Sequence, residues 1–292
     1  MKHTGKRDLT RWLFVLPAII VVCALFLYPI CSSVFYSFTN KNLIRPTYSF
    51  VGFDNYVKLF SDTKFWTSFG FNLFVGAFTI IGSNVFGFIL AYFLNENIKA
   101  KGVVRAMFFI PNIVSAVLVS FIWVFIFTNA MPALGGALGW DWLANISWFG
   151  TPSMATVTII VVSIWQNIGF LMIIYTAGLQ TIPKDVMESA ELDGCSGLKK
   201  VLKIELPLLM PTVTINLFVS ISGAFKSFDI PNAMTGGGPY GSTMPVAMNI
   251  YQEAFTKYNL GYGSAKSVIL FLTVAAVTLI QLYCTRKKEV EY

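Results

Sequence analysis

Seven charged residues crowd into one short stretch of this sequence, and they are the residues best suited to contact another molecule. Within VMESAELDGCSGLKKVLKIELPLLMP, residues 186–211, two glycines interrupt a run of acidic and then basic side chains. Charged residues make up only 12% of the whole chain, whereas a soluble domain carries about 25%. Such a segment between two apolar runs is either an ordinary solvated loop or a surface that contacts another protein.

A second set of residues with binding chemistry lies inside the apolar runs, where amide and hydroxyl side chains are unusual. These residues form a candidate substrate pathway: Trp165, Gln166, Asn167, Asn84, Asn216 and Ser220. An aromatic ring beside amide donors suits a hydroxyl-rich ligand. The alternative is that these side chains only join helices by hydrogen bonds, as such residues often do in membranes.

Other chemistries find little support in the sequence. The single histidine, His3, lies at the N-terminus, and the four cysteines include no CxxC pair, so we expect reduced thiols and no metal site. No phosphate loop, GxSxG elbow or HExxH motif occurs. No acidic or basic residue lies at the centre of an apolar run, which argues against an ion-coupled carrier. We therefore expect no catalytic residue and no cofactor in this chain.

The elements that carry these residues are predicted to be membrane helices. Apolar stretches without charge are long enough to cross a bilayer, which takes about 20 residues as a helix: 12–40, 65–95, 106–140, 142–183, 206–225 and 267–285. We place the helices near 12–38, 66–95, 106–128, 153–178, 208–228 and 263–285. The stretch 230–252 is excluded because glycine and proline interrupt it. The predicted fold class is all-α, a polytopic membrane protein with six transmembrane helices.

The distribution of positive charge predicts the orientation. With six helices both termini lie on one side, and that side collects fourteen Lys and Arg residues against seven on the other. An excess of Lys and Arg marks the cytoplasmic face. The short tails 1–11 and 286–292 are therefore expected in the cytoplasm, which also accounts for the net charge of +7 without a nucleic-acid partner.

The charged stretch itself is predicted to form two short helices joined by a turn. Pro183 suits a first helical turn, and the acidic residues that follow favour the helix dipole. Gly194 suits a left-handed position just after the helix. Ser196 can cap a second, amphipathic helix, and Pro207 marks the join to the next span.

These residues resemble the EAA loop of the membrane subunits of binding-protein-dependent ABC importers. That pattern is EAA, two residues, Asp-Gly, nine residues and I-x-L-P. The matching residues here are Glu188, Ser189, Ala190, Asp193, Gly194, Ile204, Leu206 and Pro207. Ser189 replaces the first alanine, and Val201 stands where phenylalanine is common. The resemblance implies that residues 183–207 form a coupling loop on the ATPase subunit, with contacts from Glu188, Ala190 and Gly194.

A second string narrows the resemblance to carbohydrate-uptake type 1 permeases. FKSFDIPNAMTGGGPYGSTMPVAMNIYQEAF, residues 225–255, followed by GYGSA, is similar to the string after the fifth helix in that family. The resemblance covers residues 65–285 and implies the type I ABC importer transmembrane fold for them. It also implies that the loop residues Gly236, Gly237, Gly238 and Pro239 lie near a binding protein.

The resemblance implies a permease subunit of a sugar importer that performs no bond chemistry of its own. Its implied partners are a second permease, two ATP-binding subunits that hold ATP and Mg, and an extracytoplasmic sugar-binding protein. The same machine for another polar solute, such as glycerol-phosphate, stays open. Two rival classes remain. The lack of charged residues in the spans counts against a secondary carrier, and the lack of histidine and of paired carboxylates in the spans counts against a membrane enzyme.

Overall fold

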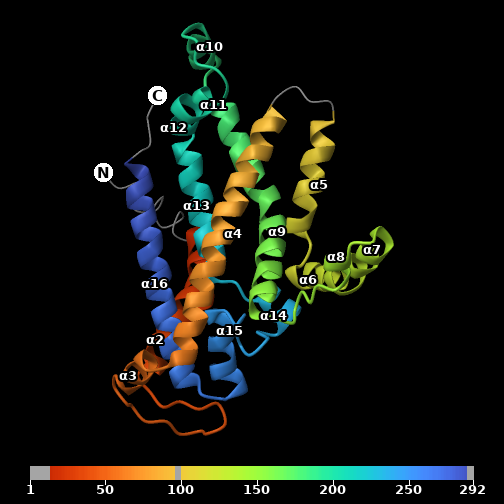
Figure 1. Ribbon diagram of the computed structural model, residues 1–292. Coiled ribbons are helices and arrows are strands. Elements are labelled where there is room, and N and C mark those ends of the chain that lie inside the picture. Colours follow the sequence, from red (N-terminus) through yellow and green to blue (C-terminus); the bar gives the residue numbers. More distant parts are fainter. Residues whose placement is uncertain (1–13, 96–99, 288–292) are drawn as a thin grey trace, which may run out of the picture. The chain divides into compact units, whose positions relative to one another are not determined.

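The computed structural model describes residues 14–95 and 100–287 (Figure 1). The predicted N-terminal tail 1–11 lies outside them, as do residues 288–292. The chain divides into two compact units. We call the first, Met1–Asp62 with Ile250–Phe271, the terminal unit, and the second, Thr63–Asn249 with Leu272–Tyr292, the bundle unit.

The described residues contain five helices that are long and apolar enough to cross a membrane. They are Phe14–Ser37, Thr63–Asn95, Ala116–Leu138, Pro152–Thr181 and Leu260–Arg286. A sixth span exists if Gly197–Leu208 and Met210–Phe225, which meet at an angle of 76°, are counted as one. The number agrees with the predicted six when this bent pair is included.

The terminal unit holds the first span and the beginning of the last. Its elements are the π turn η1 (Cys23–Leu27), α2 (Tyr28–Ser37), α3 (Asp54–Phe60), the π turn η4 (Gln252–Thr256) and the start of α16 (Leu260–Arg286). The backbone amide of Gly261 donates to the carbonyl of Lys41 at 2.8 Å. A Cβ on Gly261 would collide with the carbonyl of Thr39, so only glycine permits this approach.

Buried charges join the parts of the terminal unit. Lys266 is 1% exposed and pairs with Asp62 at 2.9 Å and Glu253 at 3.3 Å. Glu253 also pairs with Lys257 at 2.9 Å. Burial opposes ionisation of Glu253, but the hydrogen bonds and charges of the two lysines outweigh it and hold the pKa of this carboxyl below its usual value. The cluster therefore consists of charged groups that compensate one another.

The bundle unit is built around one central helix. Its larger elements are α4 (Thr63–Asn95), α5 (Lys101–Ile113), α6 (Ala116–Phe125), α9 (Pro152–Thr181) and α13 (Met210–Phe225). The helix α9 packs against α4, α5 and α13, and Figure 1 shows these helices side by side. Of the most apolar window of α9, 44% is buried, against 22% in α4, so α9 is the more enclosed of the two.

Glycines let the helices of the bundle unit approach closely. A Cβ on Gly169 of α9 would enter the backbone of Phe108 in α5. A Cβ on Gly178 would likewise meet the side chain of Thr212 in α13, and one on Gly87 of α4 would come within 3.2 Å of Leu171. Small residues at such positions are the usual device by which membrane helices pack, because lipid supplies no hydrophobic force between them.

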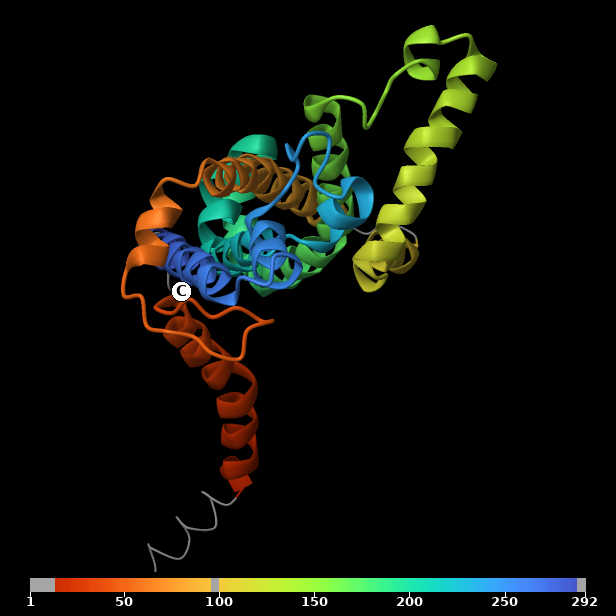
Figure 2. The ribbon, with the colours of Figure 1, turned by 90° about the horizontal axis from the view of Figure 1, so that it is seen from below.

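The shorter elements of the bundle unit connect or extend these helices. The π turn η2 (Ile126–Ala130) and α7 (Met131–Leu138) continue α6, and α8 (Asp141–Ala144) folds back on α7. Figure 2 shows this segment extending away from the group that α4, α9 and α13 form. The elements that follow α9 are α10 (Lys184–Leu192), α11 (Gly197–Lys200), η3 (Val201–Glu205), α12 (Leu206–Leu208), α14 (Asp229–Thr235) and α15 (Val246–Tyr251).

The single helix predicted near 106–128 is wrong, because the chain is extended at Val114 and Ser115 between α5 and α6. Pro111 lies inside α5 and removes a backbone donor there. Gln166 of α9 donates a hydrogen bond from Nε2 to the carbonyl of Val114 at 3.4 Å. Irregular backbone at membrane depth is tolerated where other protein groups satisfy it, and this side chain does so.

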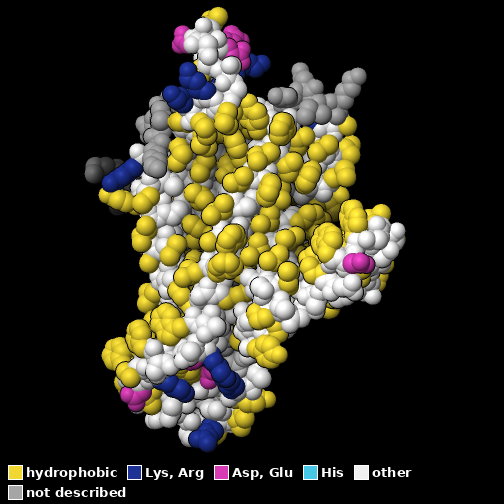
Figure 3. All heavy atoms as spheres, viewed as in Figure 1, with side chains coloured by type: hydrophobic (Ala, Val, Ile, Leu, Met, Phe, Trp, Pro, Cys, Tyr) yellow, Lys and Arg dark blue, Asp and Glu magenta, His cyan; other side chains and the backbone are white. Residues whose placement is uncertain are grey.

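The outer surface of the bundle unit is apolar where its helices are longest. Figure 3 shows hydrophobic side chains over α4 and α5 and charged ones at α10 and α11. The exposed hydrophobic side chains of α4 include Phe78 at 51%, Ile81 at 64% and Phe93 at 56% exposure. Large apolar side chains in water would be costly, so this face suits the hydrocarbon of a bilayer.

Candidate functional site

The first candidate site is the charged loop, which begins as predicted with a helix that ends at a glycine. The helix α10 runs over Lys184–Leu192, and Gly194 follows with φ of 72°. The amide of Cys195 donates to the carbonyl of Ala190 at 2.9 Å and that of Gly194 to Glu191 at 3.0 Å, so the final carbonyls are satisfied. Nothing lies within 4 Å of a Cβ at Gly194, so backbone conformation and not space favours glycine here.

The predicted contact residues of this loop differ in exposure. Glu188 and Ser189 are exposed, whereas Ala190 is 4% exposed and packs inside the loop. The small size of Ala190 therefore serves the packing of this chain. Two apolar side chains on either side of the glycine are strongly exposed, Leu192 at 88% and Leu198 at 72%. The contact residues predicted from the sequence do not include Leu192. A surface of apolar and charged side chains fits a protein partner.

The second half of the loop forms a continuous bent element. Lys200 pairs with Glu191 at 2.6 Å, which ties α11 to α10. Ser196 is the residue before α11, but its side chain makes no capping hydrogen bond. Ile204, Leu206 and Pro207 are half-buried and lead into Leu209, where the chain turns by 76° into α13.

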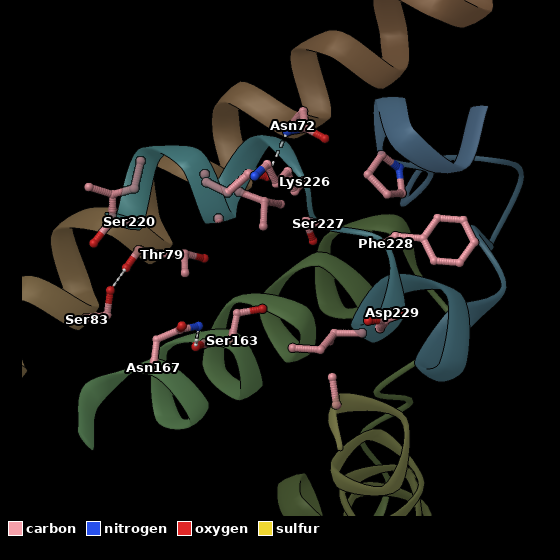
Figure 4. Close-up of a pocket in the computed structure, with 18 of the residues that line it drawn as sticks. Asn72, Thr79, Ser83, Ser163, Asn167, Ser220, Lys226, Ser227, Phe228 and Asp229 are labelled. Atoms are coloured by element: carbon pink, nitrogen blue, oxygen red, sulfur yellow. Dashed lines mark hydrogen bonds between the residues drawn. The ribbon is translucent and has the colours of Figure 1, made fainter. Parts of the chain in front are cut away.

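The second candidate site is a pocket of about 200 Å³ in the bundle unit (Figure 4). Its walls come from α4, α9 and α13, with the start of α14 closing one end. The uncharged polar residues of its lining are Asn72, Thr79, Ser83, Ser163, Asn167, Ser220 and Ser227. Hydroxyl and amide groups between apolar walls are the kind of lining that orients a small polar ligand.

Two of these hydroxyls and one amide already donate within their own helices. Ser83 donates to the carbonyl of Thr79 at 2.5 Å, and Ser220 donates to that of Asn216 at 2.6 Å. Asn167 donates from Nδ2 to the carbonyl of Ser163 at 2.8 Å. Because their hydroxyl protons are used, Ser83 and Ser220 offer a ligand oxygen lone pairs, which accept hydrogen bonds from hydroxyl groups, and so does the amide oxygen of Asn167.

Of the predicted pathway residues, Asn167 and Ser220 line the pocket. Asn84 donates to Ser220 at 3.0 Å and accepts from the hydroxyl of Tyr175 at 2.9 Å, so it links α4, α9 and α13. Asn216 is fully buried and donates to the carbonyl of Leu171 at 3.4 Å. These amides thus make the helix-joining bonds that were the alternative interpretation.

The remaining pathway residues, Trp165 and Gln166, do not line the pocket. The side chain of Gln166 already bonds to the carbonyl of Val114, where the helix is interrupted between α5 and α6. Trp165 is 37% exposed, and its ring lies edge-on to that of Trp123 at 5.4 Å between centroids. The structure therefore brings together only part of the predicted set.

Sequence reasoning missed the residues at the end of the pocket, Lys226, Ser227 and Asp229. The predicted helix ends near residue 228, but α13 ends at Phe225. The sequence FKSFD, residues 225–229, carried a signal for this earlier end. Its two charged residues, Lys226 and Asp229, indicate that the apolar helix stops before them.

The glycine-rich loop after α14 is a compact turn. Gly236 and Gly237 have φ of 59° and 85°, and Gly238 and Pro239 follow them. The hydroxyls of Thr235 and Thr243 lie 2.8 Å apart, and Thr243 donates to the carbonyl of Gly238 at 2.6 Å. The two threonines therefore hold the turn, while the glycines adopt its left-handed conformations.

Metal-ligating groups do not gather in the part of the chain that the structure describes. No set of three or more His, Cys, Asp or Glu side chains there could hold a metal ion. Cys23, Cys31, Cys195 and Cys284 form no disulfide in the structure.

Comparisons with known proteins agree on one family. Residues 83–290 match the family model described as "Binding-protein-dependent transport system inner membrane component". The chain is 34% identical over 286 residues to the "Probable starch degradation products transport system permease protein AmyD" of Thermoanaerobacterium thermosulfurigenes, covering 98% of this chain and 97% of that protein. It is 35% identical over 279 residues to the "Multiple sugar-binding transport system permease protein MsmF" of Streptococcus mutans, covering 96% of each.

Solved structures show the same fold. A chain of a bacterial ABC transporter involved in the import of the acidic polysaccharide alginate superimposes with a TM-score of 0.83. It is 20% identical to this chain, and the match covers 97% of this chain and 96% of the other. The helical fold of ABC importer permeases, predicted above, is thereby confirmed.

Proposed function

Since this chain belongs to the family of binding-protein-dependent transport system inner membrane components, we propose that it is a permease subunit of an ATP-driven importer that carries a sugar across the cell membrane. The observation that carries the proposal is the pocket lined by hydroxyl and amide groups inside a bundle whose outer surface is apolar. A hydroxyl-rich solute replaces its bonds to water with bonds to such a lining, which lowers the cost of leaving water.

The class of cargo rests on two kinds of support. The relatives described above are named for starch degradation products and for multiple sugars. The pocket lining offers oxygen lone pairs from Ser83, Ser220 and Asn167, which suit the hydroxyl protons of a mono- or oligosaccharide. Ligand pockets usually measure about 300–1,000 Å³. At about 200 Å³ this pocket is smaller, which fits a cavity that a second permease subunit completes.

The charged loop is the proposed contact with an ATP-binding subunit. The helix α10 exposes Glu188 and Leu192, and Leu198 is exposed at the start of α11. ATP and Mg would be held by two such separate subunits. When they close, they would displace α10 and, through the bent element, α13. The permease pair, expected to be a heterodimer, would then open its cavity outward, and hydrolysis would reset it.

The partners on the other side follow from the family and from charge. An extracytoplasmic solute-binding protein would deliver the sugar, with the turn at Gly236, Gly237, Gly238 and Pro239 near it. Both termini would lie in the cytoplasm, because fourteen of the Lys and Arg residues belong to that side and seven to the other.

One observation favours a second cargo. Another relative, 29% identical over 283 residues, is the sn-glycerol-3-phosphate transport system permease protein UgpA of Agrobacterium fabrum. Lys226 in the pocket lining is a cation that could face a phosphate. An importer for glycerol-phosphate is therefore the alternative within the same family.

Uptake by cells that express the complete importer tests the proposal. Glu188→Lys and Gly194→Pro are expected to abolish sugar uptake and sugar-stimulated ATP hydrolysis while the protein still inserts in the membrane. Asp54→Lys, an equal charge reversal at an exposed residue of the terminal unit, is the control. Normal uptake by both loop variants would refute the coupling role, and a calorimetric screen in which the cognate binding protein binds no sugar would refute the cargo class.

A further inference from the structure

Two ionisable residues belong to the pocket lining, and they carry opposite charges. Lys226 follows the last residue of α13, and Asp229 is the first residue of α14. All other residues of the lining are apolar or neutral polar. The formal charge that the pocket presents to its contents is therefore zero.

The two charges do not neutralise each other by direct contact. Both side chains are exposed, and the ion pairs between described residues involve Lys200, Lys257 and Lys266 instead. Figure 4 shows Lys226 near Asn72 of α4 and Asp229 at a separate place on α14. Each charge therefore remains available to a molecule in the pocket.

The arrangement suits a solute that both donates and accepts hydrogen bonds. A carboxylate accepts through two oxygens, so Asp229 can take the protons of two neighbouring hydroxyls. An ammonium group donates up to three protons, so Lys226 can reach a ring or hydroxyl oxygen. A neutral sugar offers both kinds of group on one ring.

We infer that the pocket selects neutral sugars over anionic ones, with Lys226 and Asp229 as the pair that sets this preference. The inference rests on the sugar cargo proposed above and narrows it. A uronate or phosphate group loses hydration on entering the pocket, and the opposite charges of Lys226 and Asp229 give it no net attraction that would offset this cost. A neutral sugar uses both side chains without that cost.

The test measures binding to the assembled importer without its binding protein, so that the permease alone discriminates. The probes are maltotriose and trigalacturonate, which have similar size and differ in charge. The binding of each probe is measured by saturation-transfer NMR. We expect wild-type importer to bind maltotriose more tightly. Asp229→Asn should shift the ratio of affinities toward trigalacturonate by about fivefold, the upper end for an exposed charge pair, and Lys226→Gln should shift it as far the other way.

Lys64→Gln is the matched control, because it removes one positive charge from an exposed residue of α4 outside the pocket lining. This variant should leave the ratio unchanged. If both probes bind and neither pocket variant moves the ratio more than Lys64→Gln does, or if wild-type importer prefers trigalacturonate, the inference is overturned while the sugar cargo stands. If neither probe binds wild-type importer, the inference fails together with the sugar pocket.

Discussion

Gln166 donates a hydrogen bond from its side-chain Nε2 to the carbonyl oxygen of Val114 at 3.4 Å, at the break between α5 and α6. A residue that the sequence offered as a sugar contact thus satisfies backbone where a helix is interrupted. Gln166 is 8% exposed, so water does not readily replace it. The break and the amide are therefore parts of one feature.

Replacing Gln166 should destabilise the bundle unit. Gln166→Leu removes the donor and leaves the Val114 carbonyl without it, which costs about 1–3 kcal/mol for a buried acceptor. Gln166→Glu keeps the shape but loses the donor when ionised, so it should be at least as harmful. Thermal unfolding in detergent measures both, and a midpoint equal to wild type in the two variants would show that the bond contributes nothing.

The approach of α5 to α9 should depend on Gly169. A methyl group there would enter the backbone of Phe108, which cannot move as a flexible side chain can. Gly169→Ala should cost about 1–3 kcal/mol in the free energy of unfolding, as overpacking usually does. Gly70→Ala in α4 is the control, since nothing lies within 4 Å of its Cβ, and it should gain about 0.5–1 kcal/mol. Equal stability of the two variants would refute this role of Gly169.

The exposed leucine of the charged loop should matter for assembly and not for folding. Leu192 is 88% exposed, so Leu192→Asp removes little buried surface within this chain. At a protein interface, burying the new charge should weaken co-purification of the ATP-binding subunit by at least about tenfold, or about 1.4 kcal/mol. Val57→Asp, at a residue 70% exposed in the terminal unit, serves as the control. Full recovery of the complex with Leu192→Asp would exclude Leu192 from the contact.

Acid should weaken the terminal unit through Glu253. Its pKa is held below the usual value because Lys257 and Lys266 outweigh the effect of burial. A carboxyl with a lowered folded-state pKa stabilises the fold above its unfolded pKa, about 4.3, and loses that contribution as pH falls through the folded pKa. Thermal midpoints measured from about pH 6 down to pH 3 should decline, and Glu253→Gln should reduce the slope. The same slope in Glu253→Gln as in Asp54→Asn would contradict the assignment.

Features with local causes were predictable from the sequence. The end of α10 at Leu192 followed from Gly194, which adopts the positive φ that a left-handed position needs. The apolar runs gave the spans because bilayer thickness fixes helix length. The bent pair was less visible, since Pro207 marks the region of the bend but not its angle.

Features with tertiary causes were not predictable. The break at Val114 lies in a run without charged residues, and the hydrogen bond that compensates for it comes from Gln166, 52 residues later in the chain. The charges of FKSFD indicate that α13 ends at Phe225, but they do not show that Lys226 and Asp229 line a pocket. Which amides join helices and which face the pocket depends on rotation about helix axes, and the sequence does not fix that rotation.

The bend at Leu209 lies between the charged loop and the helix that carries Ser220. The two arms, Gly197–Leu208 and Met210–Phe225, meet at 76°, and backbone bonds bridge the corner, from Leu209 to Glu205 and from Val213 to Leu209, both at 2.9 Å. Leu209 is itself 1% exposed, so the corner is stiff. If a partner pushes along the charged arm, as proposed above, an element bent by 76° would turn that push into a sideways swing of the arm that carries Ser220. The stroke delivered by a partner would thus widen or narrow the space beside α13 instead of moving the helix along its own axis.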